Sequence, residues 1–574
     1  MPEATQSVAL PELRHTAAHV LAYAVQDLFP EAKPTIGPAI ENGFYYDFER
    51  AQPFTPEDLQ KIEKRMHEIV AADLAMTGQA VTREQAIARF ASNPYKVELA
   101  QGIPDGEPIT LYTIGTFTDL CRGGHADRTS AIQGLKLTSV AGAYWRGDEH
   151  KPMLQRIYGT AWHSQAELDA HLHQIEEAQK RDHRKLGVEL DLFSIEEDAG
   201  GGLVFWHPKG AIVRGIVEQF IREGLQERGY QPVITPHIVS EKLYAISGHL
   251  DNYGDAMFGP LEAEEQRFRL KPMNCPGHIL IYKSRLRSYR ELPLRYSEFG
   301  TVYRFERSGV LHGLTRVRGF TQDDAHLFCT PEQLQGEFEQ TVEEALRLMK
   351  AFAFTEFEYV LSRRKPEERA DTDAAAEQAI RNALQRFNLP YVVDEVGGAF
   401  YGPKLDINVR DAIGRKWQLG TVQVDFVLPQ RFDLKYRDSD GDAMPVMIHR
   451  ALAGSMERFF GILVEHFGGA FPAWLAPVQA VVAPISEHQV DYAKQVAAQL
   501  RADGFRVEVD ESNEKLGHKI RHWKTQKVPY ILVVGKQELA DGSVNVNQRA
   551  VEEKRTVSIA AFAQELKQKV ESRS

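Results

Sequence analysis

The segment from Arg304 to His326, RFERSGVLHGLTRVRGFTQDDAH, is the most highly charged strand-like stretch of this sequence. If its second half is extended, side chains alternate between two faces. One face would carry Arg316, Arg318, Phe320, Gln322, Asp324 and His326, and the other Val317, Ala325 and Leu327. Such a row of guanidinium, aromatic, amide, carboxylate and imidazole groups is typical of a pocket for an anionic, ring-bearing ligand.

We expect this segment to form an antiparallel hairpin. Its first strand would hold Arg304 and Glu306, and SGVLHG would be the connecting loop. Antiparallel sheets often leave one face in water, so a solvated polar face is the competing interpretation. Other parts of the sequence are needed to distinguish a ligand pocket from a solvent-exposed polar face.

The length of 574 residues predicts three or four domains rather than one core. Hydrophobic residues make up 43% and charged residues 26%, which is typical of a globular protein and argues against disorder. The start of the chain lacks the pattern of a signal peptide, and no apolar run reaches membrane-spanning length. We therefore expect no membrane association and a cytoplasmic location.

Cysteine and charge content narrow the function further. Only three cysteines are present, Cys121, Cys275 and Cys329, so a disulfide framework is excluded and each is a free thiol or a metal ligand. The formal net charge of -12 argues against wholesale coating of nucleic acid, although a local basic surface remains possible.

Two short motifs near the N-terminus carry metal-ligand chemistry. RHTAAHVLAYAVQDLF predicts a helix that ends before Pro30 and places His15 and His19 one turn apart. DLCRGGH adds Cys121 and His125, again four residues apart. Imidazole and thiolate are the ligands that zinc prefers, so a four-residue metal or catalytic site is one interpretation. A solvated histidine pair and an unrelated buried cysteine are the alternative.

The remaining segments divide the chain. Residues 164–185 are polar and predict a linker helix, and residues from Leu186 to about Phe471 alternate strand and helix patterns around the central stretch. Near the end of that region, GSMERFFGILVEHF predicts a buried amphipathic helix with Arg458 opposite its apolar stripe. That arginine is either a surface residue or a rigidly held phosphate contact.

The last hundred residues predict a compact α/β unit without a Walker or GxGxxG signature. Its basic helix is the best local candidate for an RNA-facing surface, with an ordinary solvated face as the alternative. The helix carries Lys515, Lys519, Arg521, Lys524 and Lys527.

The central stretch, together with KPMNCPGH, GAFYGPK and VMIHRALAGSMERF, resembles the threonyl-tRNA synthetases, which are class II aminoacyl-tRNA synthetases. GPAIENGFYYDFE and AGAYWRGDEHKPMLQRIYGTAW resemble the editing domain of that family. The resemblance implies an α+β multidomain protein: an editing domain (1–163), a linker helix (164–185), an antiparallel-sheet catalytic domain (186–473) and an α/β anticodon-binding domain (474–574). The given sequence begins almost at the editing domain, so we expect a form of the family without the small ubiquitin-like N-terminal domain.

The resemblance also implies roles in binding ATP with Mg²⁺. Pro236 would be the motif 1 proline at a homodimer interface. In motif 2, Arg304 would hold the α-phosphate, Glu306 would recognise adenine and Phe320 would stack on it. Arg316 and the motif 3 arginine, Arg458, would hold the outer phosphates, with Lys404 and Gln418 near ATP and the adenylate. Positive charge placed where negative charge develops is what such a displacement needs.

Cys275, His326 and His449 match the three zinc ligands of the family. The resemblance implies one zinc per subunit, with an open position that threonine fills. Gln322, Asp324 and Tyr401 would complete the threonine pocket. Valine lacks the hydroxyl, and a site built for a hydroxyl rejects its absence by roughly 10⁴ or more. Serine lacks only a methyl, worth about 10 to 200-fold, so editing is needed.

The implied editing reaction is hydrolysis of Ser-tRNA(Thr). Its core would be His15, His19, Cys121 and His125, with Lys96 and Asp119 as further matches. Two roles stay open for the first four: binding a metal, or positioning water and the tRNA end. CRGGH departs from the usual CRGPH at Gly124, which we expect to loosen the turn. Anticodon contacts would include Lys527 and Glu538, while Asn547 stands where an arginine is common.

Two other functions compete with threonine ligation. A synthetase for another small amino acid, such as serine or proline, is disfavoured by Cys275, His326 and His449, because zinc suits a substrate with adjacent amine and hydroxyl groups. A catalytically silent RNA-binding paralogue should have lost Arg304, Arg458 or a zinc ligand, and this sequence keeps them all.

Overall fold

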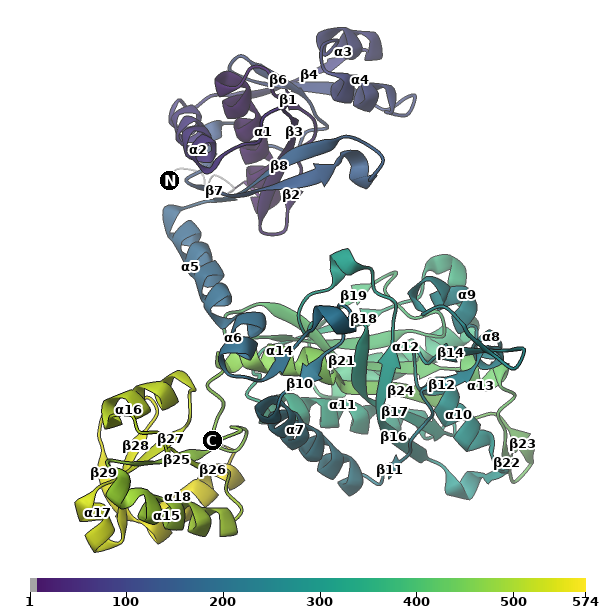
Figure 1. The fold of residues 1–574 in the computed structure, drawn as a ribbon. Helices are drawn as coiled ribbons and strands as arrows, with labels where there is room; N and C mark the ends of the chain where they lie inside the picture. The colour runs from purple at the N-terminus through teal and green to yellow at the C-terminus, as the bar shows by residue number, and fades with distance from the viewer. Residues whose placement is uncertain (1–7, 574) are drawn as a thin grey trace, which may run out of the picture. The chain divides into compact units, whose positions relative to one another are not determined.

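The computed structural model describes residues 8–573, which form two compact units, one up to residue 176 and one from residue 177 onward. In the first unit, helix α1 (Leu10–Leu28) packs across strands β3 (Gly43–Glu49) and β8 (Met153–Trp162) of a sheet (Figure 1). The sheet order is β1-β3-β8-β7, with β2 paired to β3. The remaining strands of this sheet are β1 (Lys33–Pro34), β2 (Ala39–Ile40) and β7 (Gly134–Tyr144).

The alanine-rich sequence of α1 explains its close approach to the sheet. Ala17, Ala18 and Ala22 are fully buried, and small side chains let the helix backbone lie near Phe44 and Phe48 of β3. A second sheet has the order β4-β5-β6 and carries the cysteine motif at its end. Its strands are β4 (Met76–Val81), β5 (Ile109–Ile114) and β6 (Phe117–Leu120). Helices α2 (Pro56–Ala71), α3 (Arg83–Arg89) and α4 (Pro94–Gln101) complete the unit.

The second unit contains an eight-stranded sheet, antiparallel at its centre, in the order β11-β16-β17-β24-β21-β20-β18-β19. Only the outer pairs β11/β16 and β18/β19 are parallel. In that order the strands are β11 (Gln231–Pro232), β16 (Leu294–Tyr303), β17 (Gly319–Cys329), β24 (Val446–Ser455), β21 (Lys416–Asp425), β20 (Lys404–Arg410), β18 (Phe357–Ser362) and β19 (Tyr391–Asp394).

The large core of this sheet lies on one face, against helices α7 (Pro208–Glu227), α11 (Leu334–Ala351), α12 (Asp371–Arg386) and α14 (Met456–Phe467). The expected stripe of α14 is confirmed, since Met456, Phe459, Phe460, Leu463 and Val464 are buried. Because the apolar face is covered in this way, the polar side chains of β17, β24 and β21 line the cavity on the other face.

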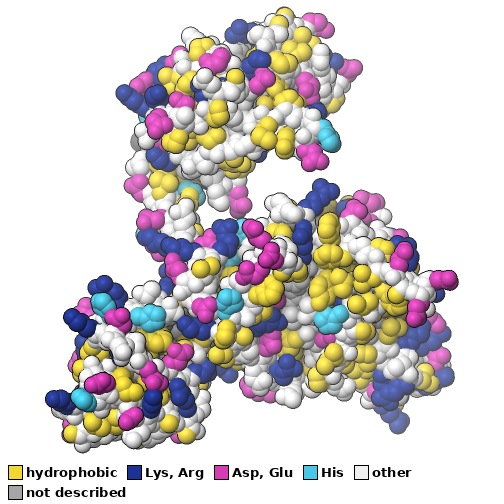
Figure 2. All heavy atoms as spheres, viewed as in Figure 1, with side chains coloured by type: hydrophobic (Ala, Val, Ile, Leu, Met, Phe, Trp, Pro, Cys, Tyr) yellow, Lys and Arg dark blue, Asp and Glu magenta, His cyan; other side chains and the backbone are white. Residues whose placement is uncertain are grey.

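The C-terminal part has the sheet order β26-β25-β27-β28-β29, as the α/β pattern predicts. Its strands are β25 (Ala480–Pro484), β26 (Val507–Val509), β27 (Tyr530–Val534), β28 (Ser543–Gln548) and β29 (Arg555–Ser558). Its helices are α15 (Val490–Ala502), α16 (Leu516–Thr525), α17 (Lys536–Asp541) and α18 (Ile559–Glu571). Over most of the face shown in Figure 2 both charge signs are interspersed, and Lys and Arg side chains gather at its lower right, so the net negative charge forms no single-sign surface there.

Two expectations about elements are wrong. Residues 164–185 do not form one helix: α5 (Gln165–Arg181) ends and α6 (His183–Glu189) begins after Asp182, whose carboxylate accepts the Arg184 N–H as an N-cap. Arg304 and Glu306 also follow β16 rather than lying in it.

Among the described residues, the helices fall short of the length and apolar content needed to cross a bilayer.

Candidate active sites

A cavity of about 510 Å³ opens over β17, β24 and β21. It brings together most of the residues expected from the sequence. The expected residues that line it are Cys275, Arg304, Glu306, Arg316, Phe320, Gln322, Asp324, His326, Tyr401, Lys404, Gln418, His449 and Arg458. Phe320, Gln322, Asp324 and His326 share one face of β17, so the alternation predicted for the strand itself is confirmed.

The alternation fails before the strand begins. Val317 lines the cavity, although it was expected on the other face, and Arg318 does not. The reason is that β17 starts only at Gly319, after a turn closed by His312 and Arg316. Arg318 instead donates to the Glu306 carbonyl (2.9 Å) and to Ser308 (3.2 Å), so it holds the loop together.

One end of the cavity is cationic. The Arg304 guanidinium lies 5.1 Å from the centre of the Phe320 ring, and Arg316 pairs with Glu306 at 3.1 Å. Burial and the nearby charge of Arg316 lower the pKa of Arg458, whose Nε atom is buried without a hydrogen-bond partner among the described residues. Glu306 compensates Arg316, but Arg304 and Arg458 form no ion pair within the described residues, so this end of the cavity favours an anion such as a phosphate group.

Asp406 orders two further residues of this end. One carboxylate oxygen accepts from Lys404 (2.9 Å) and Ser362 (3.2 Å), and the other from Gln418 (2.7 Å) and Thr421 (2.9 Å). The Asp406 side chain is buried, with 6% exposed, and its hydrogen bonds fix the positions of the Lys404 and Gln418 side chains. Sequence reasoning missed Asp406, whose only signal is its position two residues after Lys404 on β20.

The other end of the cavity holds a buried cysteine and two buried histidines. Cys275 begins helix α10 (Cys275–Lys283), while His326 and His449 are directly opposed on β17 and β24. Their ligand atoms lie within 4.8 Å of one another, and His326 Nε2 is 2.9 Å from His449 Nδ1. A thiol and two imidazoles form a donor set that suits zinc. Burial raises the pKa of the Cys275 thiol well above its usual range, so a cation is needed to favour its thiolate.

The second nitrogen of each imidazole is also engaged. His326 Nδ1 lies 2.8 Å from His278 Nδ1, and His449 Nε2 lies 2.7 Å from Asp425. Such partners orient metal-binding histidines. Sequence reasoning missed both; the one available signal was that His278 lies three residues after Cys275, on the same helix face.

Polar groups surround this end. Asp324 accepts from Asn274 at 3.0 Å, and Tyr401 stacks on His449 with ring centres 4.7 Å apart. The Tyr401 hydroxyl donates to Gln423 at 2.6 Å. Within residues 8–573, Asn274 Oδ1 is buried and has no hydrogen-bond partner. The pocket therefore offers acceptors and a carboxylate to a small polar ligand.

The first unit contains a second cluster, as the sequence predicted. Ligand atoms of His15, His19, Cys121 and His125 lie within 4.8 Å of one another. Cys121 Sγ is 3.1 Å from His125 Nε2 and 3.5 Å from His15 Nε2. Burial favours the neutral thiol, but hydrogen bonds from the three histidines lower the pKa of Cys121 to about 3.

Asp119 and Lys96 lie behind this cluster, buried and ion-paired. Asp119 also contacts His19 Nδ1 at 3.2 Å and accepts from the Tyr46 hydroxyl, a residue that sequence reasoning missed. Burial favours neutral His19, but bonds to Asp119 and Cys121 raise its pKa to about 9. The lowered pKa of Cys121 and the raised pKa of His19 favour a thiolate–imidazolium pair, which together with the Asp119–Lys96 pair balances the charge of the cluster.

Gly124 has a φ of 79°, and a Cβ there would meet no atom of the described part of the chain within 4 Å. Proline is locked near -65° and could not adopt this conformation. The carbonyl of Gly124 lies 3.2 Å from His15 Nδ1. The glycine therefore permits a turn that brings a backbone acceptor to the cluster.

The basic helix of the C-terminal part, α16, is shorter and less available than expected, because Lys515 is its N-cap and Lys527 lies beyond its end. Lys519 is buried and donates to the Asp510 carbonyl at 3.0 Å, and Lys527 donates to the Gly468 carbonyl. Glu538 accepts from Gly535 N–H at 2.9 Å at the start of α17, and Asn547 contacts Asn545. Lys515, Arg521 and Lys524 remain exposed.

Comparison with protein families gives three matches in chain order. Residues 109–158 match the threonyl and alanyl tRNA synthetase second additional domain, residues 260–467 the tRNA synthetase class II core domain (G, H, P, S and T), and residues 479–569 an anticodon binding domain. The fold is thus that of a class II aminoacyl-tRNA synthetase.

Relatives specify the family. A threonine–tRNA ligase of Acidithiobacillus ferrooxidans is 54% identical over 570 residues, covering 98% of this chain and 88% of that protein. A chloroplastic/mitochondrial threonine–tRNA ligase of Arabidopsis thaliana is 49% identical, covering 100% and 89%. A structure described as the RNA binding domain of threonyl-tRNA synthetase from Cryptosporidium parvum has a TM-score of 0.65 and 40% identity, covering 68% of this chain and 98% of that one.

The chain belongs to the threonine–tRNA ligase family. It ligates threonine to tRNA with ATP and carries the editing domain of that family. The expected fold class and activity are both confirmed.

Proposed function

We propose that the cavity of the second unit forms threonyl-adenylate and that Cys275, His326 and His449 hold one zinc ion per subunit. The observation that carries this proposal is the joining of a cationic end and a thiol–imidazole end in one cavity. When bound there, zinc would supply an electropositive position for the amino and hydroxyl groups of threonine.

In this proposal the threonine carboxylate attacks the α-phosphorus of ATP. A bond from carboxylate oxygen to phosphorus forms, the bond to the bridging oxygen breaks, and pyrophosphate leaves with Mg²⁺. Arg304 acts at the α-phosphate, while Arg316 and Arg458 act at the outer phosphates. Phe320 stacks on adenine, Glu306 recognises it, and Lys404 and Gln418 are positioned by Asp406. Fixed positive charge lowers the barrier because negative charge is redistributed during the displacement.

Threonine selectivity is assigned to the other end. Asp324 accepts a hydrogen bond from the threonine hydroxyl, with Gln322 and Tyr401 beside it. Valine would leave this buried carboxylate without a donor, which disfavours it strongly. Serine would satisfy Asp324, so its rejection needs a second site.

We assign that second site, which hydrolyses Ser-tRNA(Thr), to His15, His19, Cys121 and His125, supported by Lys96 and Asp119. Their balanced charge supports a role in positioning water and the tRNA end rather than in binding a second zinc. We also propose the domain bounds expected from the sequence: 1–163, 164–185, 186–473 and 474–574. In the last domain, Lys527 and Glu538 are the proposed anticodon contacts.

The active form is proposed to be a homodimer. Ile234, beside Pro236, is 91% exposed, and Leu280 and Leu286 are also exposed. A cavity of about 300 Å³ lies between these elements, lined by Ile234, Pro236 and Leu280. Exposed apolar side chains around a pocket indicate a surface that a second copy covers. A cytoplasmic location is proposed from the three free cysteines.

The metal assignment is tested by anomalous scattering at the zinc absorption edge from crystals of the full chain. A single peak is expected between Cys275, His326 and His449. A peak only at Cys121, or none in zinc-replete protein, would contradict the assignment.

A further inference from the structure

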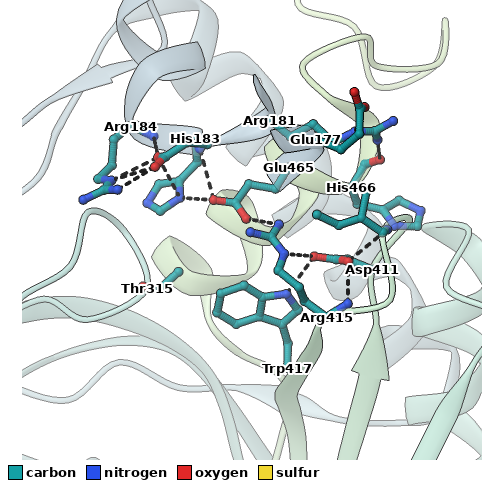
Figure 3. Close-up of polar contacts among 12 residues, drawn as sticks. Glu177, Arg181, His183, Arg184, Thr315, Asp411, Arg415, Trp417, Glu465 and His466 are labelled. Carbon is teal, nitrogen blue, oxygen red and sulfur yellow. Dashed lines mark hydrogen bonds and ion pairs between the residues drawn. The ribbon is translucent and has the colours of Figure 1, made fainter. Parts of the chain in front are cut away.

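His183 lies at the start of α6. Among the described residues of the linker region (164–185), it is the one fully buried histidine, with an exposed fraction of 0%. Both of its ring nitrogens have partners. Nδ1 lies 2.6 Å from Glu465 Oε1 (Figure 3). Nε2 lies 2.9 Å from the backbone nitrogen of Leu314. A carboxylate accepts and a backbone N–H donates, so Nδ1 carries the proton and Nε2 is an acceptor.

Glu465 is itself held firmly. It accepts from the His183 backbone N–H at 3.1 Å and from Arg415, which also pairs with Asp411 at 2.8 Å (Figure 3). Trp417 donates to the same Asp411 at 3.0 Å. Glu465 belongs to α14, the helix that carries Arg458, so His183 is fixed to the frame of the ATP end of the cavity.

Asp182, His183 and Glu465 also have ligand atoms close enough to hold a metal. The charges argue against one. Asp182 pairs with Arg184 and Glu465 with Arg415, so both carboxylates are already compensated. The Leu314 N–H takes the lone pair of His183 Nε2. The cluster is a hydrogen-bonded support rather than an ion site.

The loop that contacts His183 can approach it closely because glycines stand at two positions of contact. A Cβ at Gly313 would lie 2.1 Å from His183 Nε2, and one at Gly461 of α14 would lie 3.2 Å from Leu314 Cβ. Side chains at these two positions would push the loop away from the ring. Leu314 is fully buried, so the loop is anchored by packing as well as by its N–H.

Arg316 follows two residues later, on the arm of the turn that leads into the cavity. The turn is closed by the His312 N–H to the Arg316 carbonyl (3.1 Å) and the Arg316 N–H to the His312 carbonyl (3.2 Å). The Leu314 N–H lies inside this turn. Fixing it therefore fixes where the backbone of Arg316 lies.

We infer that His183, through the bond from Leu314 N–H to its Nε2 atom, is a positioning residue that holds Arg316 at the outer phosphates of ATP. The inference rests on the role proposed above for Arg316. His183 touches no reacting atom. Its effect should therefore fall on ATP and not on threonine, whose proposed pocket is at the other end of the cavity.

Two amide substitutions separate its two bonds. In His183→Gln the amide reaches the place of Nε2 and can accept from Leu314. In His183→Asn the amide lies near Nδ1, can donate to Glu465, and leaves Leu314 N–H without an acceptor. Threonine-dependent ATP–pyrophosphate exchange should show a KM for ATP raised about tenfold by Asn and by threefold or less by Gln, the loss expected for one positional hydrogen bond. The KM for threonine should be unchanged in both.

A double-mutant cycle guards against a general folding effect. Because His183 is proposed to act through Arg316, adding His183→Asn to Arg316→Ala should raise the KM for ATP no further. Equal effects of Gln and Asn, equal rises in both KM values, or full additivity with Arg316→Ala would overturn the inference. If wild-type protein shows no threonine-dependent exchange, the proposed function fails instead.

Discussion

Asp425 Oδ2 lies 2.7 Å from Nε2 of His449, and the other oxygen of Asp425 accepts the N–H groups of Val427 (2.7 Å) and Leu428 (2.9 Å). The Asp425 carboxylate is fully buried and is held by these two backbone N–H groups, so it fixes the orientation of the His449 imidazole. It places the proton on Nε2 and leaves Nδ1 facing His326 and Cys275.

Asp425→Asn should therefore weaken zinc binding by about 10 to 100-fold, the usual cost of losing such a partner. Competition with a chelator measures this. Asp406→Asn, which alters a buried carboxylate that bonds Lys404 and Gln418 rather than the histidines, should keep wild-type affinity. Equal affinities of all three proteins would refute the role given to Asp425.

Zinc content separates the two cysteine clusters. Wild-type protein should contain about one zinc per chain. Cys275→Ser should abolish it, and Cys121→Ser should leave it unchanged, because the editing cluster balances its own charge. Loss of zinc in Cys121→Ser would show that the editing cluster binds the metal.

His15→Ala combined with His19→Ala should leave threonylation intact and slow deacylation of purified Ser-tRNA(Thr) by about 100-fold or more, as expected for lost acid–base and positioning groups. Ser-tRNA(Thr) should then accumulate in a charging assay. His163→Ala, which alters a histidine outside the cluster, is the matched control. Unchanged deacylation by the double variant would refute the editing assignment.

The proposed dimer depends on the apolar surface around Ile234. Ile234→Asp should raise the dimer dissociation constant by about 30-fold or more, because a buried charge replaces an apolar anchor. Sedimentation velocity over a concentration series measures this. Met153→Asp changes an apolar residue elsewhere that is 62% exposed and should have no effect. A wild-type protein that sediments as a monomer at all concentrations would exclude the dimer.

Glu298 supplies a pH test of stability. Burial favours its neutral form, but bonds from His278, Thr235 and Lys271 lower its pKa from 4.5 to about 2. Its stabilisation is therefore complete above about pH 4.5 and is lost as the pH falls toward 2, and it is worth at most about 3 kcal/mol. The urea midpoint difference between wild type and Glu298→Gln should be constant above pH 5 and shrink from pH 4.5 to 3.5. A difference that stays constant through that window would contradict an ionised Glu298.

The elements with strong periodicity were predictable from the sequence. The buried stripe of α14 and the alternation from Phe320 to His326 both follow from local spacing. The break at Asp182 was not, because it depends on Glu465, 282 residues away, bonding the backbone and side chain of His183. Strand ends were missed for a similar reason: Arg318 and Val317 are placed by a turn rather than by alternation.

The sites show the same limit. Spacing along the chain was enough to suggest the first-unit cluster, because its members occur in two pairs four residues apart. Cys275, His326 and His449 are far apart in sequence, and only family resemblance selected them. The partner Asp425 and the support from Asp406 required the register of the sheet. The partner His278 required the position of helix α10 beside His326.

The most direct test of the central claim is ATP–pyrophosphate exchange by zinc-replete protein with threonine, serine and valine in turn. Exchange should be fast with threonine, lower by about 10 to 200-fold in kcat/KM with serine, and lower by roughly 10⁴ or more with valine. Exchange that is absent with threonine, or as fast with valine, would contradict it.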